Sequence, residues 1–327
     1  MTDGTDPTTL AEGSRAAMPP YALGRHIAFM RGEAPEAARD WMQVDVFKAS
    51  VVDLTAGMTQ LLHELTMGVF WPHRGHDLDL LLQLGQGWIA LDQIGRPLSA
   101  AMHFGAGTDF AMCGMMVTTP RLQAQGTGRW LLRRVMVACA GRDLRLSATR
   151  DGYRLYESAG FVPVGLISQH QGRVRRIQPP APVAGLTLRP AVAADLPRIA
   201  ALDAHAYGAP RHEVLTAIAG LSQVVVAERA GVMTGFAMMR DFGRGHVIGP
   251  LVAEDEAEAI ALAAGFIEAM PDRFLRLDTP QQDSALSAFL AAAGMGVFDT
   301  VTEMRLGRMR RALTGPVTWG LAAHSLG

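Results

Sequence analysis

Two glycines stand where the chain changes from a strand-like to a helical pattern. Gly126 and Gly128, in the stretch RLQAQGTGRW, follow the run FAMCGMMVTT and open a helical pattern over 126–139. The first turn of a helix carries unpaired N–H groups and a partial positive charge, which together bind phosphate. Glycine removes the side chain that would keep a ligand away from the backbone. The two glycines therefore predict a pyrophosphate site at this helix terminus.

Two familiar phosphate loops do not match this stretch. A nucleotide P-loop requires Gly-Lys-Ser/Thr at the start of the helix, whereas Gly128 is followed by Arg129 and Trp130. A Rossmann fingerprint has three glycines in the first strand-to-helix turn of a parallel unit, whereas this loop has two and follows the fourth strand of the pattern. Taken alone, the two glycines also fit an ordinary loop, so a second signal is needed.

The pattern around the loop predicts a domain in the order β, α, α, β, β, β, α, β, α, β. Apolar periodicity and turn signals place strands at 46–52, 87–95, 96–105, 110–119, 143–148 and 161–172, and helices at 54–71, 76–85, 126–139 and 152–160. Asp53 is the expected N-cap of the first helix. The three consecutive strands before the loop form an antiparallel meander, and the loop follows the last of them.

The chain divides into two expected domains. At 327 residues it exceeds one hydrophobic core, and Pro179, Pro180 and Pro182 interrupt any helix or central strand. The pattern after these prolines loosely repeats the first layout. The expected parts are a flexible or loosely docked arm at 1–45, a first domain at 46–175, a Pro-rich linker at 176–185, a second domain at 186–307 and a docked tail at 308–327.

A second motif lies downstream of the glycine loop. LYESAGF, residues 155–161, follows the expected strand at 143–148. Together the loop and this segment resemble the GNAT superfamily of N-acetyltransferases, whose acyl-CoA loop reads Gln/Arg-x-x-Gly-x-Gly/Ala and whose later segment reads Leu-Tyr-x-x-x-Gly-Phe. The resemblance covers about 46–175 and implies acetyl-CoA as co-substrate. It also implies an α/β (α+β) fold, in which a mixed, mostly antiparallel sheet flanked by helices is splayed to admit pantetheine.

The resemblance assigns roles to residues of this loop and strand. It implies that backbone N–H groups hold the pyrophosphate, from Gln123, Ala124, Gln125, Gly126, Thr127, Gly128 and Arg129. Met116 and Val117 would pair with the pantetheine amides, and an N–H near Val117 would meet the developing oxyanion. Tyr156 would protonate the departing thiolate, because a phenol is protonated at neutral pH. Thr149 stands where the superfamily often has Asn.

The acceptor side of the site is less constrained by the sequence. Trp71, His73 and Arg74 follow the first helix, in a region that commonly lines the acceptor pocket in the resembling family, and His103 lies on a neighbouring strand. His73 and Arg74 would suit an acceptor that carries a carboxylate. The general base stays open among His73, Asp77, His103 and Asp109.

The second half carries a contrasting loop. HVIGPLVAEDEAEA occupies the place of the glycine loop but offers Glu254, Asp255 and Glu256, which stabilise a helix N-terminus and repel a phosphate. We therefore expect a degenerate second domain and one CoA per chain. Tyr207, Arg211 and His246 are candidate acceptor contacts in this half, with ordinary surface or core positions as the alternative.

Composition narrows the partners. A formal net charge of −1 gives no field for nucleic acid, and no run approaches the roughly 18 apolar residues of a membrane span. Cys113 and Cys139 lie in apolar segments, which favours a reducing, cytoplasmic location. The expected function is acetyl transfer from acetyl-CoA to a primary amine of a small molecule, without a metal and with a homodimer possible. A non-catalytic acyl-CoA sensor or assembly module, or acetylation of a protein amine, stays open.

Overall fold

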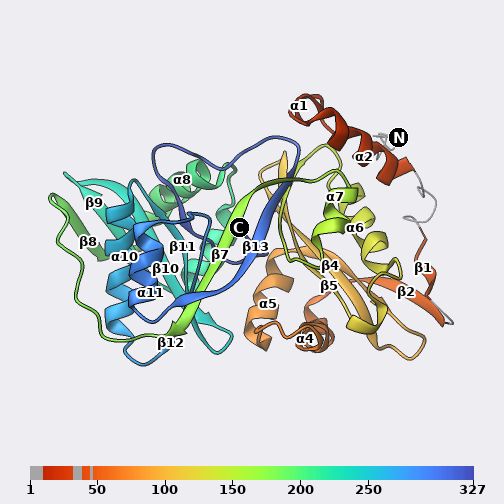
Figure 1. Cartoon of the computed structure of the whole chain (residues 1–327), viewed down its shortest axis with the longest axis horizontal. Helices are drawn as coiled ribbons and strands as arrows, with labels where there is room; N and C mark the ends of the chain where they lie inside the picture. The colour runs from red at the N-terminus through yellow and green to blue at the C-terminus, as the bar shows by residue number, and fades with distance from the viewer. Residues whose placement is uncertain (1–9, 32–38, 45–46) are drawn as a thin grey trace. The chain divides into compact units, whose positions relative to one another are not determined.

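The computed structural model describes residues 10–31, 39–44 and 47–327, which form two compact units. Unit 1 comprises Met1–Val164 and Glu303–Met309, and unit 2 comprises Gly165–Thr302 and Arg310–Gly327. Each unit is a sheet covered by helices (Figure 1). The expected α/β (α+β) fold, with mostly antiparallel sheets flanked by helices, is confirmed.

Unit 1 contains one sheet with helices on both faces. Its helices are α1 (Glu12–Ala16), α2 (Pro20–Arg31), α4 (Thr59–Gly68), α5 (Gly75–Leu84), α6 (Thr127–Ala138) and α7 (Tyr153–Ser158), with 3-10 turns η1 (Ala56–Met58) and η2 (Pro120–Leu122). Its strands are β1 (Trp41–Val44), β2 (Phe47–Asp53), β3 (Gln86–Leu91), β4 (Pro97–Ala106), β5 (Phe110–Thr118) and β6 (Asp143–Ala148). The sheet order is β1-β2-β3-β4-β5-β6, and β13 (Gly296–Leu306) follows β6.

The two faces of this sheet carry different helices. Leu131, Leu132 and Val135 of α6 share one core cluster with Ala101 of β4 and Cys113 of β5. The buried leucines of α4 and α5 lie outside that cluster, on the opposite face of β4 and β5 (Figure 1). Strand alternation produces this division, because successive side chains point to opposite faces of a sheet.

Strands β5 and β6 pair only over the first part of their length. They run parallel with partners from Phe110↔Asp143 to Cys113↔Leu146, and the pairing stops there. A bulge follows at once on β5, because Ala100 faces Val117 while Met102 faces Gly114, and Met115 has φ of 50°. Bulges bend and twist a strand. The sheet therefore splays beyond Cys113, as the sequence resemblance implies.

The N-terminal arm is expected to be flexible or loosely docked. Its described part is docked, since Leu10, Met18, Phe29 and Met30 lie in the core cluster of unit 1. Residues 1–9 and 32–38, also assigned to the arm, lie outside the described residues. The weak periodicity of this segment hid its docking, because short helices with few apolar contacts give little sequence signal.

Unit 2 repeats the architecture. Its helices are α8 (Leu196–Tyr207), α9 (His212–Gly220), α10 (Glu256–Ala269) and α11 (Ala285–Ala292), with the 3-10 turn η3 (Ala193–Asp195). Its strands are β7 (Val162–Arg173), β8 (Leu186–Pro190), β9 (Ser222–Arg229), β10 (Val232–Phe242), β11 (Gly245–Ala253), β12 (Phe274–Thr279) and β14 (Val317–Gly320). The order is β7-β12-β11-β10-β9-β8, and β14 pairs with β11. Helices α10 and α11 share one core cluster, from which the buried residues of α8 and α9 are absent.

The division of the chain differs from the expected boundaries. Unit 2 begins at Gly165, inside β7, whereas the sequence predicted the boundary at the linker 176–185. That linker contains no helix or strand, and β8 begins after it at Leu186. Residues 303–309 of β13 and its exit belong to unit 1, although the sequence placed them in the second domain and the tail. A strand pattern records burial but not the sheet that it joins, so this exchange left no signal.

The sequence also made predictions for the N-cap of α4 and for the C-terminal tail. Asp53 ends β2, and α4 begins at Thr59 after a 3-10 turn, so Asp53 is not the N-cap of that helix. The tail is docked as expected, since β14 pairs with β11 and Leu321 and Ala322 are fully buried.

Candidate functional site

The glycine loop connects β5 to α6 through two residues in the left-handed region. Ala124 has φ of 67° and Gly126 has φ of 92°. Gly126 is the N-cap of α6 and provides no side-chain cap. The left-handed conformation is costly for residues with a Cβ, which accounts for glycine at 126. Gln123, Ala124, Gln125 and Gly126 are exposed, so the loop presents its backbone to solvent.

The first turn of α6 has the features of an anion site. The N–H groups of the four residues from Gly126 to Arg129 form no hydrogen bond with another described residue. The turn carries no acidic residue. The hydroxyl of Thr127 is buried, and it too has no partner in the part of the chain that the structure describes. Unpaired donors at a helix N-terminus attract a phosphate oxygen.

Gly128 is explained by a ligand better than by the protein. A methyl group at this position would lie 3.4 Å from Thr118 Oγ1 and 3.6 Å from a Leu155 methyl, which are ordinary contacts. Its φ is not positive, so neither sterics nor backbone conformation requires glycine. Close approach by a phosphate would require it. The loop therefore fits a pyrophosphate.

The splay exposes one edge of β5 next to this loop. Thr119 N–H donates to Leu98 O at 2.9 Å, and the carbonyl of Val117 accepts from Ser99 Oγ at 2.9 Å, so Val117 faces β4. Backbone groups of successive residues point to opposite edges. Met116 and Thr118 therefore direct their amides toward the splay. The geometry favours these two residues as partners for an extended ligand, and it does not favour Val117.

Tyr156 lies on α7 at the level where β5 and β6 separate. Its side chain is 6% exposed and meets the Phe161 ring edge-on at a centroid distance of 6.1 Å. Burial raises the pKa of Tyr156 well above its ordinary value, and the Cys113 thiol adds to the shift. Cys113 is the last residue of β5 that pairs with β6. The phenol is therefore a protonated donor close to the splay.

Helix α2 holds α6 and α7 together. The ring of Phe29 is contacted by the guanidinium groups of Arg129 at 4.9 Å and Arg133 at 4.8 Å. Arg129 also donates to Ser158 Oγ at 3.2 Å. Gly160, the glycine of LYESAGF, has φ of 95°, and a methyl group there would lie 2.7 Å from Ala22 O. The arm thus buttresses both the helix of the glycine loop and the helix of Tyr156.

Comparison with known proteins shows the family to which this sequence is similar. Residues 199–314 match the model of an acetyltransferase (GNAT) domain. An uncharacterised N-acetyltransferase of Bacillus subtilis, YitH, is 26% identical over 236 residues, which are 68% of this chain and 79% of YitH. The second half of the chain therefore resembles a GNAT acetyltransferase domain. The family match lies mostly in unit 2, whereas the glycine loop and Tyr156 lie in unit 1.

Solved structures show the same fold over most of the chain. A proposed acetyltransferase of Pyrococcus horikoshii has a TM-score of 0.69 at 19% identity, over 85% of this chain and 96% of its own. A tandem GNAT protein from the clavulanic acid biosynthesis pathway has a TM-score of 0.58 at 16% identity, over 79% of this chain and 98% of its own. At these identities the likeness is one of fold.

The expected acceptor residues do not all come together. Trp71, His73 and Arg74 lie in the connection between α4 and α5, where the rings of Trp71 and His73 are 5.8 Å apart. A methyl group added at Gly68, the last residue of α4, would lie 3.9 Å from the Pro120 ring. The end of α4 is therefore close to η2, which precedes the glycine loop. His103 faces Cys113 across β4 and β5 and hence points to the α6 face, opposite α4 and α5.

The expected candidates for the general base have other roles in the structure. Asp77 is buried and accepts from Arg74 N at 2.7 Å, so it caps α5. Asp109 lies before β5, at the end where β5 and β6 are paired, and contacts Arg308 at 2.9 Å. Burial lowers the pKa of His103, and Arg142 lowers it further. His73 follows α4, whose end is close to Pro120, and it stays a candidate.

Two contributors were missed by the sequence reasoning. Thr118 presents its amide to the splay, and a strand pattern cannot give the edge to which an amide points. Phe29 packs on α6 although it lies about a hundred residues upstream of its arginine partners, as the contact from Arg133 Nε to Phe29 O at 2.9 Å shows. Apolar residues in the PYALGRHIAFMR run were the available signal.

Unit 2 uses the equivalent position differently. Asp255 caps α10 by accepting from Glu258 N at 2.9 Å, and Glu256 accepts from Leu286 N at 3.0 Å. Beyond Val247, where the pairing of β11 with β12 ends, β11 pairs instead with β14 from Ala253 to Leu251. Leu321 N–H then donates to Asp278 O of β12 at 2.8 Å. The tail therefore fills the splay of unit 2.

The expected acceptor contacts of the second half are structural. Arg211 is buried, pairs with Asp203 at 2.8 Å and donates to the carbonyl oxygens of Leu326 and Gly327. Tyr207 is 2% exposed beneath Arg211, whose guanidinium is 3.8 Å from its ring. His246 contacts Asp241 at 3.0 Å. Tyr207 and Arg211 hold the tail and do not line an open site.

Metal and membrane features are absent from the described chain. Over 10–31, 39–44 and 47–327, no group of three or more His, Cys, Asp or Glu side chains could hold a metal ion. No helix in the same ranges is long and apolar enough to cross a membrane.

Proposed function

We propose that unit 1 is an acetyl-CoA-dependent N-acetyltransferase that acts on a primary amine of a small molecule. One observation carries the proposal: β5 and β6 part after Cys113 and Leu146, directly beside a helix N-terminus whose N–H groups are unpaired. Similarity to the GNAT acetyltransferase domain supports acyl transfer, and the loop chemistry supports a pyrophosphate-bearing acyl carrier.

The residues of unit 1 divide the work. Acetyl-CoA supplies an acetyl thioester when bound. The N–H groups from Gly126 to Arg129 hold the pyrophosphate, and the amides of Met116 and Thr118 orient the pantetheine arm along β5. A backbone N–H on the same edge faces the thioester oxygen as negative charge develops there. The amine attacks the thioester carbonyl directly within a ternary complex, and Tyr156 donates its proton to the sulfur as the C–S bond breaks.

The acceptor enters from the α4–α5 connection in this proposal. Trp71, His73 and Arg74 follow the end of α4, which is close to Pro120 ahead of the glycine loop. Arg74 at the start of α5 is exposed and suits an acceptor carboxylate, and His73 accepts the amine proton. Replacement of Arg74 by Ala should raise the KM for the acceptor; an unchanged KM would remove Arg74 from the site.

Unit 2 serves no second cofactor in this proposal. Carboxylates cap α10 where unit 1 has unpaired N–H groups, and β14 occupies the edge of β11. Isothermal titration calorimetry with CoA should give one site per chain. A stoichiometry of two would contradict the assignment. Homodimer formation and a cytoplasmic location remain predictions from the sequence.

The decisive experiment measures thiol release from acetyl-CoA with a panel of small amines, polyamines and amino acids. Turnover with a small amine supports the proposal. Tight CoA binding without turnover on any amine would favour an acyl-CoA sensor, and turnover restricted to peptide N-termini or lysines would favour a protein substrate. Because each outcome has a separate readout, binding and chemistry are tested independently.

A further inference from the structure

A cluster of ionic contacts joins the closed end of the splay in unit 1. Asp109 immediately precedes β5, and Asp143 is the first residue of β6, so both carboxylates lie at the end where the two strands pair. Asp143 N–H donates to Asp109 O at 2.9 Å. This end is opposite to the open part of the splay beyond Cys113 and Leu146.

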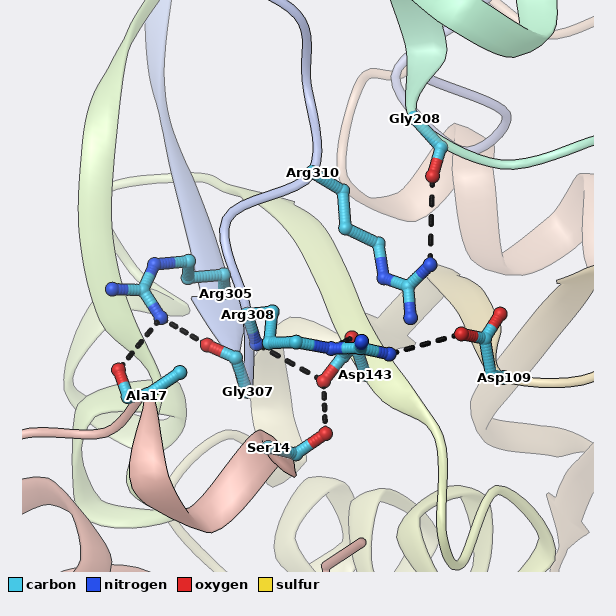
Figure 2. Close-up of polar contacts among 9 residues, drawn as sticks. All are labelled: Ser14, Ala17, Asp109, Asp143, Gly208, Arg305, Gly307, Arg308 and Arg310. Carbon is cyan, nitrogen blue, oxygen red and sulfur yellow. Dashed lines mark hydrogen bonds and ion pairs between the residues drawn. The ribbon is translucent and has the colours of Figure 1, made fainter. Parts of the chain in front are cut away.

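Arg308 bridges the two carboxylates (Figure 2). Its Nε contacts Asp143 Oδ2 at 2.8 Å, and its terminal nitrogen contacts Asp109 Oδ2 at 2.9 Å. Its backbone N–H also donates to Asp143 Oδ1 at 3.0 Å. A guanidinium group has the fork geometry for two carboxylates, which a lysine lacks. Arg308 therefore links β5 to β6 at the closed end of the splay, which we call the apex.

Asp143 makes this contact more than a surface ion pair. Its side chain is fully buried, whereas those of Arg308 and Asp109 are about half exposed. Ser14 of the arm donates to the same carboxylate (Figure 2). A methyl group at Gly307 would overlap Asp143 Oδ1, and Gly307 has φ of 97°. The chain is thus shaped to bring Arg308 onto a buried charge.

The segment that carries Arg308 belongs to unit 1 but comes from the far end of the sequence. Residues 303–309 lie in unit 1, β13 follows β6 in the sheet order, and Met304 and Leu306 are in the unit 1 core. Arg305 in this segment donates to the carbonyls of Ala17 and Gly307 (Figure 2). Unit 1 is therefore incomplete without the second half of the chain.

A ligand in the splay would pull on the closed end, where β5 and β6 are paired. Only the pairs from Phe110↔Asp143 to Cys113↔Leu146 connect β5 to β6 through the ladder. A ligand inserted beyond them holds the free ends of the strands apart, and that short ladder has to resist the separation. A contact that fastens the closed end fixes the separation that the ligand meets, and preorganisation of this kind raises affinity.

We propose that Arg308 is a positioning residue for acyl-CoA in unit 1, and that the second half of the chain serves the first by supplying it. The inference rests on the proposed function, because it requires that CoA binds in the splay. Binding and apex contacts are then linked, so that CoA stabilises the seating of 303–309 and loss of Arg308 weakens CoA binding.

The test compares two arginines that have similar contacts in different units. Arg189 of unit 2 also bridges two carboxylates, the buried Asp195 at 2.7 Å and Glu228 at 2.7 Å. Arg308→Gln should weaken CoA binding about tenfold in calorimetry, and Arg189→Gln should leave the CoA affinity unchanged although it removes an equivalent ion pair. Asp109→Asn removes one arm of the bridge and should give a smaller loss, which covers the case that Arg308→Gln fails to fold.

Hydrogen exchange provides the second readout. CoA should slow amide exchange in 303–309 of the parent chain, and Arg308→Gln without ligand should speed exchange in 110–113 and 143–146. Unchanged CoA affinity in both Arg308→Gln and Asp109→Asn would overturn the inference. If the parent chain does not bind CoA, the proposed function is wrong. The apex contact is then still judged by exchange in the ligand-free chain, where unchanged rates in Arg308→Gln would show that it does not fasten the strands.

Discussion

The two units share a strand–loop–helix segment, but its strand edge and its helix N-terminus are occupied differently in the two. In unit 1, β5 separates from β6 after Cys113, and α6 begins with unpaired N–H groups and no acidic residue. In unit 2, β11 pairs with β12 at His246 and Val247, after which β14 takes its edge and carboxylates cap α10. Both units have a splay, but only that of unit 2 is filled by its own chain among the described residues.

This difference shows two ways in which the backbone amides at the edge of a splayed strand can gain hydrogen-bond partners. A splayed sheet leaves amide groups on the edges of two strands, and buried amides need partners. Unit 2 supplies those partners permanently with a strand of the tail. Unit 1 leaves its edge for a ligand, which is a requirement for a binding site. The fold alone therefore does not give function, and the occupant of the splay is the difference between the two copies.

The largest expected effect concerns the chemistry of unit 1. Tyr156→Phe should lower kcat about 10²–10⁴-fold with little change in CoA affinity, because it removes one proton donor and preserves the ring packing. Tyr153→Phe, on the same helix, is the matched control and should retain activity. Stopped assays of thiol release and calorimetry measure the two quantities. Equal losses of turnover and CoA affinity would contradict a catalytic role for Tyr156.

The tail of unit 2 should be worth several kcal/mol of stability. Trp319 is 9% exposed, and its indole N–H donates to Ala253 O at 3.2 Å. Trp319→Ala should lower the free energy of unfolding by about 3–5 kcal/mol, since it leaves a cavity and an unpaired carbonyl. Urea unfolding measures this loss. CoA affinity should not change, and a large change would mean that unit 2 takes part in cofactor binding.

A side chain at Gly128 should separate affinity from stability. Gly128→Val should weaken CoA binding about tenfold or more, because the β-carbon and the two methyl groups of valine occupy the space next to the N–H groups. Gly265→Val in α10 is the matched control, since nothing lies within 4 Å of an added methyl group there. Both variants should have similar thermal stability. CoA binding by Gly128→Val at the parental affinity would place the pyrophosphate elsewhere.

The buttress formed by α2 should give a smaller kinetic effect. Phe29→Leu keeps an apolar side chain but removes the ring that Arg129 and Arg133 contact, and it should lower kcat severalfold at nearly constant CoA affinity. Phe266→Leu makes the same change in the core of unit 2 and should leave kcat unchanged. Phe29→Tyr should restore turnover. Failure of that rescue would assign Phe29 to stability alone.

The smallest predicted effect is a pH dependence of stability. The pKa of Tyr156 is raised in the folded state, so the unfolded chain loses this proton first as the pH rises above about 10. The unfolded state then binds fewer protons, and the free energy of unfolding should fall by up to about 1.4 kcal/mol per pH unit. Tyr156→Phe should remove this component in urea titrations at pH 9–11. An identical slope in both proteins would show that the phenol is not buried.

The sequence predicted the main elements and the loop because they are local features. The strand at 143–148 and the helix over 126–139 match β6 and α6 closely. Contacts that link distant residues were not predicted, including the docking of Phe29 on α6 and the filling of the splay of unit 2 by β14. Apolar periodicity reports which face is buried but not which element covers it.

The candidate site likewise contains local features, which the sequence predicted, and long-range placements, which it did not. The glycines and LYESAGF are short motifs with their own physical reasons, and they located the loop and Tyr156. The placement of His103 and Asp109 required the strand register, because one residue of slip, or the bulge at Met115, changes the face to which every later side chain points.

By itself, the sequence determined that the first copy has an open helix N-terminus and that the second has a carboxylate-capped one, since these properties depend on a few adjacent residues. Only the tertiary structure decided that residues 303–309 complete unit 1 and that 317–320 close the splay of unit 2. Strand pairing over such separations depends on backbone hydrogen bonds that any sequence can form, and no residue type records the partner.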